Sequence, residues 1–191
     1  MGKIFKVIFF VIVLVIGAAY LEMSGYVYHN DIIAKISGHS VEGLDVSHHQ
    51  IKINWKKVDK KYKFVIMKAT EGKDFLDTDF FYNWNNARLN GFIVGAYHFF
   101  SMLSSGKAQA DYYISKVPAS DKTLPPVIDL EIPVKYPKSL VLREMKDMID
   151  KLEEHYGKRV IIYVTYHTYN AYIKGEFPQN SLWIRDIKFY P

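Results

Sequence analysis

The sequence predicts an α/β protein in which a parallel β-sheet is covered by helices. Short, almost continuous apolar runs, typical of buried strands, alternate with segments whose apolar residues recur every three or four positions. Polar or aromatic residues follow each apolar run, as expected where the carboxyl ends of parallel strands meet at one rim. These patterns allow a barrel or an open sheet, although no glycine-rich phosphate loop marks the switch point of an open, doubly wound sheet.

Composition limits the function classes. The 191 residues suit one domain, and an apolar content of 49% is ample for a core. The absence of cysteine excludes disulfides, a thiolate nucleophile and a cysteine zinc site. The formal net charge is +5, but the lysines are scattered, so we expect no nucleic-acid partner.

The N-terminus predicts contact with a membrane. Lys3 and Lys6 precede an uncharged apolar run over 7–21, which is typical of a cationic segment followed by a membrane-inserting core. We expect a signal-anchor or cleaved signal peptide over 1–23, and we favour the uncleaved anchor. A polar linker over 24–42 and a folded domain over 43–191 follow, which places the protein in a bacterial envelope or, after cleavage, outside the cell.

The domain divides into alternating strands and helices. Strands are predicted at 43–47, 64–69, 92–100, 125–133, 159–164 and 181–185. Helices are predicted at 54–61, from Thr78 to Gly91, from Ser104 or Ser105 to Lys116, from Leu142 to Gly157, and at 168–174. The expected N-terminal caps are Asn54, Thr78 and Ser104 or Ser105, and the glycine stops are Gly91, Gly157 and Gly175.

Two carboxylates end the fourth predicted strand, which reads Pro-Pro-Val-Ile-Asp-Leu-Glu-Ile-Pro. Strand side chains alternate between faces, so Asp129 and Glu131 point the same way, about 6 to 7 Å apart. Close carboxylates raise one pKa and leave the other group ionised. This division suits acid–base chemistry on an acetal.

Other chemistries are weaker interpretations. Adjacent His48 and His49 on a strand end should point to opposite faces, which makes them poor ligands for one metal ion. Ser47 lies near histidines, but no Gly-x-Ser-x-Gly elbow is present. Lys68 and Glu71 are expected to form a structural ion pair. We therefore expect no metal and no cofactor.

The strand ends together resemble a known family. The matching blocks are Gly43-Leu-Asp-Val-Ser-His-His-Gln50, Met67-Lys-Ala-Thr-Glu-Gly72, Gly95-Ala-Tyr-His-Phe-Phe100, Pro126-Val-Ile-Asp-Leu-Glu131 and Leu182-Trp-Ile-Arg-Asp186. In order and spacing they resemble glycoside hydrolase family 25, the Chalaropsis-type lysozymes or N-acetylmuramidases. The resemblance implies a TIM-like (β/α) barrel that cleaves the β-1,4 bond between N-acetylmuramic acid and N-acetylglucosamine in peptidoglycan, with retention of configuration.

The resemblance also implies roles for individual residues. Glu131 is similar to the general acid, Asp129 to the carboxylate that orients the substrate's N-acetyl group, and Asp45 to a supporting carboxylate. Because such substrate-assisted enzymes depart from the rule that relates carboxylate separation to stereochemistry, the spacing of the pair does not indicate inversion. The expected substrate contacts are Tyr97, Tyr163, Trp183 and His98, and we expect a monomer.

The sequence departs from the family pattern at its end. That pattern continues with a Trp-Gln-Tyr strand and an Asp-Leu-Asn strand, whereas this sequence stops at Pro191. We therefore expect a C-terminally incomplete barrel, in which Asp186 does not take over the missing aspartate's role. The alternative to an active lysozyme is a non-catalytic peptidoglycan-binding protein or an inactive truncated homologue.

Overall fold

The computed structural model describes residues 2–24, 36, 38 and 41–186, which fall into two compact units. One unit contains α1 (Gly2–Met23), and the other spans Val41–Arg185. Helix α1 is the one helix in the described part of the chain that is long and apolar enough to cross a membrane, although a signal sequence meets the same criterion. Most of the predicted linker lies outside the described residues, and its last residue, Glu42, begins the first strand.

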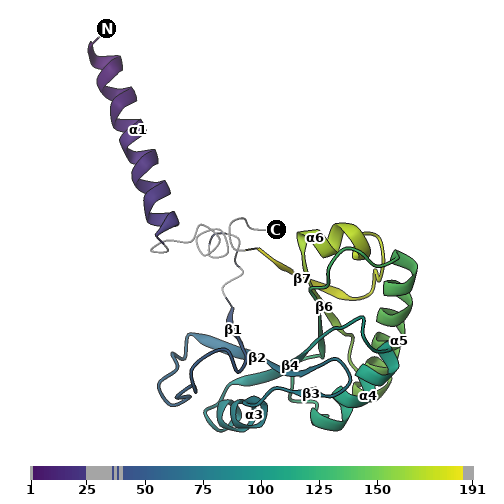
Figure 1. The fold of residues 1–191 in the computed structure, drawn as a ribbon. Coiled ribbons are helices and arrows are strands. Elements are labelled where there is room, and N and C mark those ends of the chain that lie inside the picture. Colours follow the sequence, from purple (N-terminus) through teal and green to yellow (C-terminus); the bar gives the residue numbers. More distant parts are fainter. Residues whose placement is uncertain (1, 25–35, 37, 39–40, 187–191) are drawn as a thin grey trace. The chain divides into compact units, whose positions relative to one another are not determined.

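The larger unit is built on one curled, mostly parallel sheet (Figure 1). Its strands are β1 (Glu42–Val46), β2 (Tyr62–Glu71), β3 (Phe75–Leu76), β4 (Ile93–Phe99), β5 (Val127–Leu130), β6 (Ile161–Thr165) and β7 (Ser181–Arg185). The order is β1-β2-β4-β5-β6-β7, and β3 pairs with β2 as a short antiparallel strand that the sequence did not predict. The six predicted strands and the α/β class are thus confirmed.

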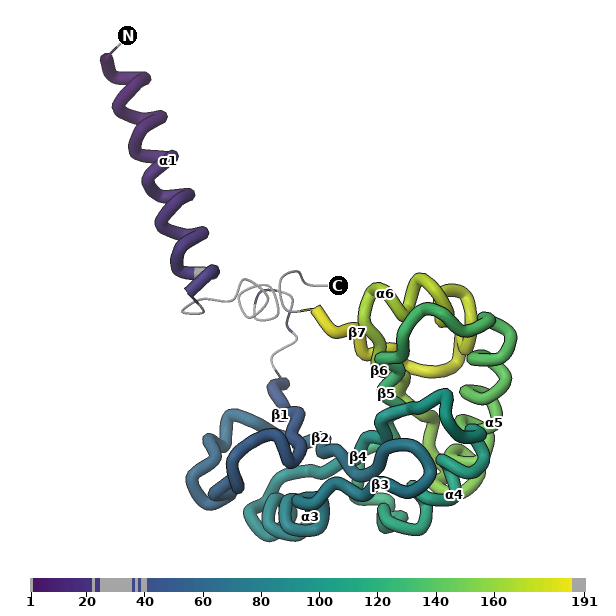
Figure 2. The backbone as a smooth tube through the Cα atoms, viewed as in Figure 1, coloured from purple at the N-terminus to yellow at the C-terminus, as the bar shows by residue number. Residues whose placement is uncertain are grey.

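Helices cover the convex side of the sheet, as the backbone tube in Figure 2 also shows. They are α3 (Phe80–Leu89), α4 (Gly106–Lys116), α5 (Lys138–Tyr156), the short α6 (Tyr166–Thr168) and the π-helical turn η1 (Tyr169–Ile173). Alternate strand residues such as Met67, Leu130 and Ile162 are fully buried and belong to the same core as Met145 and Leu152 of α5. The remaining strand residues therefore face the concave side.

Helix ends follow the expected chemistry at several points. The Ser105 side chain accepts a hydrogen bond from the Ala108 backbone N–H and begins α4, while Gly157 ends α5 in the left-handed region, with φ of 62°. The predicted helix over 54–61 is wrong. This segment forms only turns, and Trp55 is buried by tertiary contacts, including an indole hydrogen bond to Asn83 Oδ1 of 3.1 Å.

Candidate active site

Five of the predicted site residues meet on the concave face of the sheet, because strand alternation turns each of them inward. They line one small cavity of about 10 Å³ and are Asp45 of β1, Tyr97 of β4, Asp129 of β5, Tyr163 of β6 and Trp183 of β7. A second, mostly apolar cavity of about 480 Å³ also reaches Asp45 and Trp183. Residues from both outer strands, β1 and β7, line this larger cavity.

The carboxylates of the site influence one another. Burial, followed by the nearby Glu131 and Asp45 charges, raises the pKa of Asp129 to about 8, and the residue is only 8% exposed. Burial and the charge of Glu131 also raise the pKa of Asp45 to about 6, in a residue that solvent still reaches. Within this cluster Asp129 therefore holds a proton at neutral pH.

Glu131 lies just beyond β5 and close to the positively charged side chain of Arg185. Its Oε1 is 3.7 Å from the guanidinium of Arg185 at the end of β7. Among the described residues, Oε1 of Glu131 and Oδ1 of Asp129 are buried and have no hydrogen-bond partner. Unsatisfied acceptors of this kind are available to donors of a ligand. Sequence reasoning placed Arg185 at a strand end but gave it no role, because strand order alone did not reveal this ion pair.

Aromatic side chains form the rest of the wall. The rings of Tyr163 and Trp183 meet edge to face, with centroids 4.9 Å apart and planes at 88°. Burial raises the pKa of the Tyr97 and Tyr163 hydroxyls well above the ordinary value, so both remain protonated and able to donate hydrogen bonds. Apolar ring faces and polar tips together suit a pyranose ring.

His98 does not reach the cleft, and its predicted contact with substrate does not fit this placement. The residue is fully buried on the helix-covered side of the sheet. Its Nδ1 lies 2.8 Å from Thr70 Oγ1 and its Nε2 lies 2.9 Å from Gln109 Oε1. Both ring nitrogens are thereby engaged, and burial lowers the pKa of His98 to about 4.

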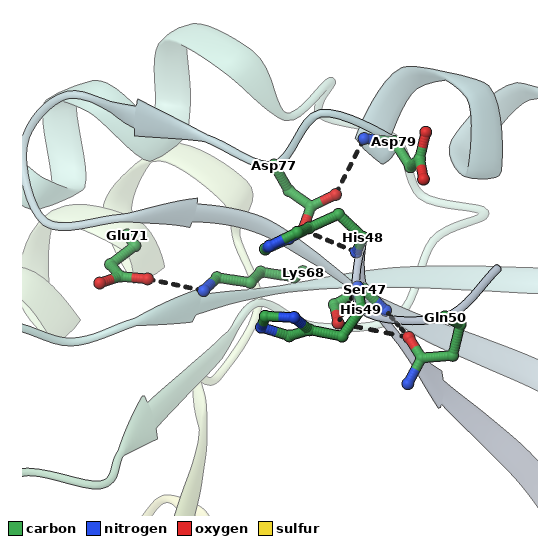
Figure 3. A network of polar contacts seen from close by, with 8 residues as sticks. All are labelled: Ser47, His48, His49, Gln50, Lys68, Glu71, Asp77 and Asp79. Carbon is green, nitrogen blue, oxygen red and sulfur yellow. Dashed lines mark hydrogen bonds and ion pairs between the residues drawn. The ribbon is translucent and has the colours of Figure 1, made fainter. Parts of the chain in front are cut away.

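The two neighbouring histidines do not point apart. Strand β1 ends at Val46, and the following turn brings the His48 and His49 rings side by side, with centroids 4.0 Å apart (Figure 3). The fully buried carboxylate of Asp77 orients His48, accepting from its Nδ1 at 2.6 Å and from its backbone N–H at 3.0 Å. No cluster of three metal-ligating side chains occurs among the residues that the structure describes.

The predicted ion pair between Lys68 and Glu71 is confirmed. Lys68 Nζ lies 2.6 Å from Glu71 Oε2, and the lysine side chain is 8% exposed (Figure 3). The same ammonium lies over the Phe75 and Phe99 rings, at 5.3 and 5.0 Å from their centroids. Lys68 is thus held by three partners at the margin of the site.

The chain is similar in sequence to known proteins. The sequence profile of glycosyl hydrolases family 25 matches residues 44–190. YegX of Escherichia coli K12, an uncharacterised protein, is 32% identical over 172 residues, which cover 86% of this chain and 63% of YegX. Lysozyme M1 of Streptomyces globisporus is 38% identical over 161 residues, covering 75% of this chain and 54% of that protein.

The fold is also similar to that of a solved structure. A family 25 glycosyl hydrolase from Bacillus anthracis superposes with a TM-score of 0.76 and 43% sequence identity, covering 79% of this chain and 72% of that structure. The chain spans less than two thirds of the length of the curated relatives named above. The profile match covers most of the domain, and the chain belongs to glycosyl hydrolase family 25.

Proposed function

We propose that this protein is a peptidoglycan hydrolase that cleaves the β-1,4 bond between N-acetylmuramic acid and N-acetylglucosamine with retention of configuration. One observation carries the proposal: Asp45, Asp129 and Glu131 interact electrostatically on a concave rim whose wall contains Tyr97, Tyr163 and Trp183. Coupled carboxylates beside aromatic rings suit acid–base cleavage of a glycoside.

The roles of the two central carboxylates are unequal. Glu131 donates a proton to the leaving oxygen, and Asp129 accepts a hydrogen bond from the substrate's acetamide N–H, so that the acetamide oxygen attacks the anomeric carbon. Asp45 supports the pair electrostatically. The pKa of Asp129, raised by burial to about 8, however favours a proton on this carboxylate at neutral pH. In the proposed mechanism this proton passes from Asp129 to Glu131 once the substrate is bound.

The proposal also includes the architecture of the domain, its location and its partner. The curled sheet forms part of a TIM-like (β/α) barrel, and α1 holds the domain at a membrane of the bacterial envelope, facing the wall. Peptidoglycan glycan strands are the partner, and the domain acts as a monomer without a cofactor.

The decisive experiment is the substitution Glu131→Gln. This variant should release no new reducing ends from purified cell wall, while still sedimenting with insoluble wall, because the amide keeps the shape of the side chain but has no acidic proton to donate. Glu154→Gln, which alters an exposed glutamate of α5, is the matched control and should keep wild-type turnover. Near-normal turnover by Glu131→Gln would overturn the proposed mechanism.

A second candidate function is wall binding without catalysis. Within the described residues the outer strands β1 and β7 are not paired with each other, which leaves the apolar cavity of about 480 Å³ open between them. If the wild-type chain sediments with wall but releases no reducing ends under any condition tested, this second function replaces the first.

A further inference from the structure

Arg185 is a cation of the site with unused binding capacity. Its guanidinium is 3.7 Å from Glu131 Oε1, which is longer than a hydrogen bond, and its side chain is 54% exposed. This is the one ion pair of Arg185 within the part of the chain that the structure describes. A guanidinium carries five N–H donors in a planar fork that matches a carboxylate. Most of these donors therefore remain available to a ligand.

Lys68, the other nearby cation, is differently placed. Both Lys68 and Arg185 lower the pKa of Asp129, so both lie within electrostatic reach of the centre. The lysine is nearly buried and is held by Glu71 at 2.6 Å, whereas Arg185 stands open at the end of β7. An anion that approaches the cleft would therefore be received by Arg185.

We propose that Arg185 binds a carboxylate of the glycan substrate and releases Glu131 when it does so. This inference rests on the proposed function and specifies the substrate as a carboxylate-bearing glycan. Two sources share this chemistry: the lactyl ether group of muramic acid, where it is free, and the stem peptide. The negative charge of the acidic cluster would otherwise repel such an anion, and a bidentate pair with Arg185 offsets that repulsion.

Release of Glu131 also explains how the catalytic proton reaches it. While Arg185 faces Glu131 at 3.7 Å, the raised pKa of Asp129 keeps a proton on Asp129. Once the substrate's carboxylate draws the guanidinium away, the O–H bond of Asp129 breaks, an O–H bond forms on Glu131, and the negative charge moves to Asp129. The titratable and charged groups that face this pair are Asp45, Lys68, Tyr97, Tyr163 and Arg185.

The test compares full-length wild type with Arg185→Gln on three saccharides. The first is a neutral N-acetylglucosamine oligomer, the second is peptide-free glycan with free lactyl carboxylates, and the third is glycan that carries stem peptides. Arg143→Gln is the matched control, because Arg143 is also exposed and paired with a glutamate but lies on α5. Dissociation constants are measured by titration calorimetry, and KM and kcat where turnover occurs.

Arg185→Gln should weaken binding of a carboxylate-bearing glycan roughly tenfold and change binding of the neutral oligomer less than twofold. The tighter binding of carboxylate-bearing glycan by the wild type than by Arg185→Gln should become less pronounced as the salt concentration is raised. Loss on the second saccharide identifies the lactyl carboxylate, and loss on the third alone identifies the stem peptide. Where turnover is measurable, the alkaline limb of kcat/KM should move to higher pH in Arg185→Gln, because Asp129 loses a cation that lowers its pKa.

Equal effects on neutral and carboxylate-bearing saccharides, or no effect on a variant that melts as the wild type does, would overturn the role of Arg185. The binding measurement separates this inference from the proposed function. Arg185-dependent binding without any hydrolysis would leave the inference standing and remove the enzyme activity. If Arg185→Gln leaves hydrolysis unchanged, the proposed enzyme activity stands and the role of Arg185 is overturned.

Discussion

His98 Nε2 donates a hydrogen bond of 2.9 Å to Gln109 Oε1. The direction follows from the amide, whose Oε1 also accepts from the Ser101 backbone N–H at 2.9 Å and whose Nε2 donates to the Ser101 and Ser104 carbonyls at 2.7 and 2.9 Å. Nδ1 then accepts from Thr70. His98 thereby ties β4 and β2 to α4, whose Gln109 in turn holds the loop that precedes this helix.

The first prediction concerns His98→Ala. The substitution should lower the melting temperature markedly, because the buried Thr70 hydroxyl loses its acceptor and Gln109 Oε1 loses one of its two donors, at a cost of about 1–3 kcal/mol, and a cavity is left behind. KM should stay unchanged if the variant is assayed well below its melting temperature. His49→Ala, which alters an exposed neighbouring histidine of the rim, is the control and should melt as the wild type does.

His98 also gives stability a defined pH dependence. Its folded pKa of about 4 lies below the ordinary value of 6.5, so the unfolded chain binds the proton more tightly. The stability that His98 contributes is therefore complete above pH 6.5 and is lost as the pH falls towards 4, by roughly 2–3 kcal/mol. His98→Ala should flatten this part of the stability profile, and an unchanged slope would contradict the assignment.

The sequence contained the information needed to place His98 correctly. Tyr97 and His98 are neighbours on one strand, and side chains of neighbouring strand residues face opposite sides, so both cannot line one cleft. The alternation of side chains correctly placed Asp129 on the concave face. It would have excluded His98 from the cleft once Tyr97 was assigned to that face. The family block alone could not make this distinction, because a matching block identifies residues but not the face on which each lies.

The other predictions succeeded where local sequence pattern determines the structure and failed where tertiary contacts do. Local sequence pattern predicted β5, from an apolar run between prolines, and α5, from a regular helical period, and in both it agrees with tertiary packing. It failed at 54–61, where Trp55 is held by contacts with a distant helix, and at His48, where the strand ends earlier than expected and a turn follows. The ion pair of Arg185 joins the ends of β5 and β7, which lie on either side of β6, and local sequence patterns do not encode this long-range relationship.

A further prediction concerns the close approach of α4 and α5 at Gly106. A Cβ atom at this position would lie 1.8 Å from the Glu144 carbonyl oxygen, and the Gly106 backbone N–H donates to Glu144 Oε2 at 2.9 Å. Gly106→Ala must push the two helices apart, at a cost of about 2 kcal/mol. We expect the melting temperature to fall by about 4–8 °C, measured by circular dichroism.

Lys107→Ala is the matched control for Gly106→Ala. It introduces alanine at the next position of α4, where the lysine side chain is 68% exposed and pairs with Asp147 only at 3.9 Å. Its effect should stay within about 0.5 kcal/mol. If both substitutions destabilise the protein equally, helix propensity or surface charge, and not the contact between α4 and α5, governs this region.

The last prediction concerns Asp129→Asn. Asp129 has a folded pKa of about 8, above the ordinary 3.8, so the folded protein holds this proton more tightly than the unfolded chain. The wild type should lose stability as the pH rises from about 4 to 8, because the unfolded chain releases this proton in that range whereas the folded protein keeps it. Asparagine resembles the neutral acid and avoids this cost.

Melting curves of wild type and Asp129→Asn at pH 5, 7 and 9 test this prediction. The advantage of the variant should be small at pH 5 and grow to several degrees at pH 9, since each kcal/mol moves the melting temperature by about 2–4 °C in a chain of this size. Asp121→Asn removes an exposed carboxylate outside the cleft and should follow the wild type at every pH. A constant difference between Asp129→Asn and wild type would mean that ionisation of Asp129 does not control stability, and it would weaken the assignment of the catalytic proton to this residue. A growing difference would mean that the cleft holds its proton on Asp129 at a measurable cost to the folded state.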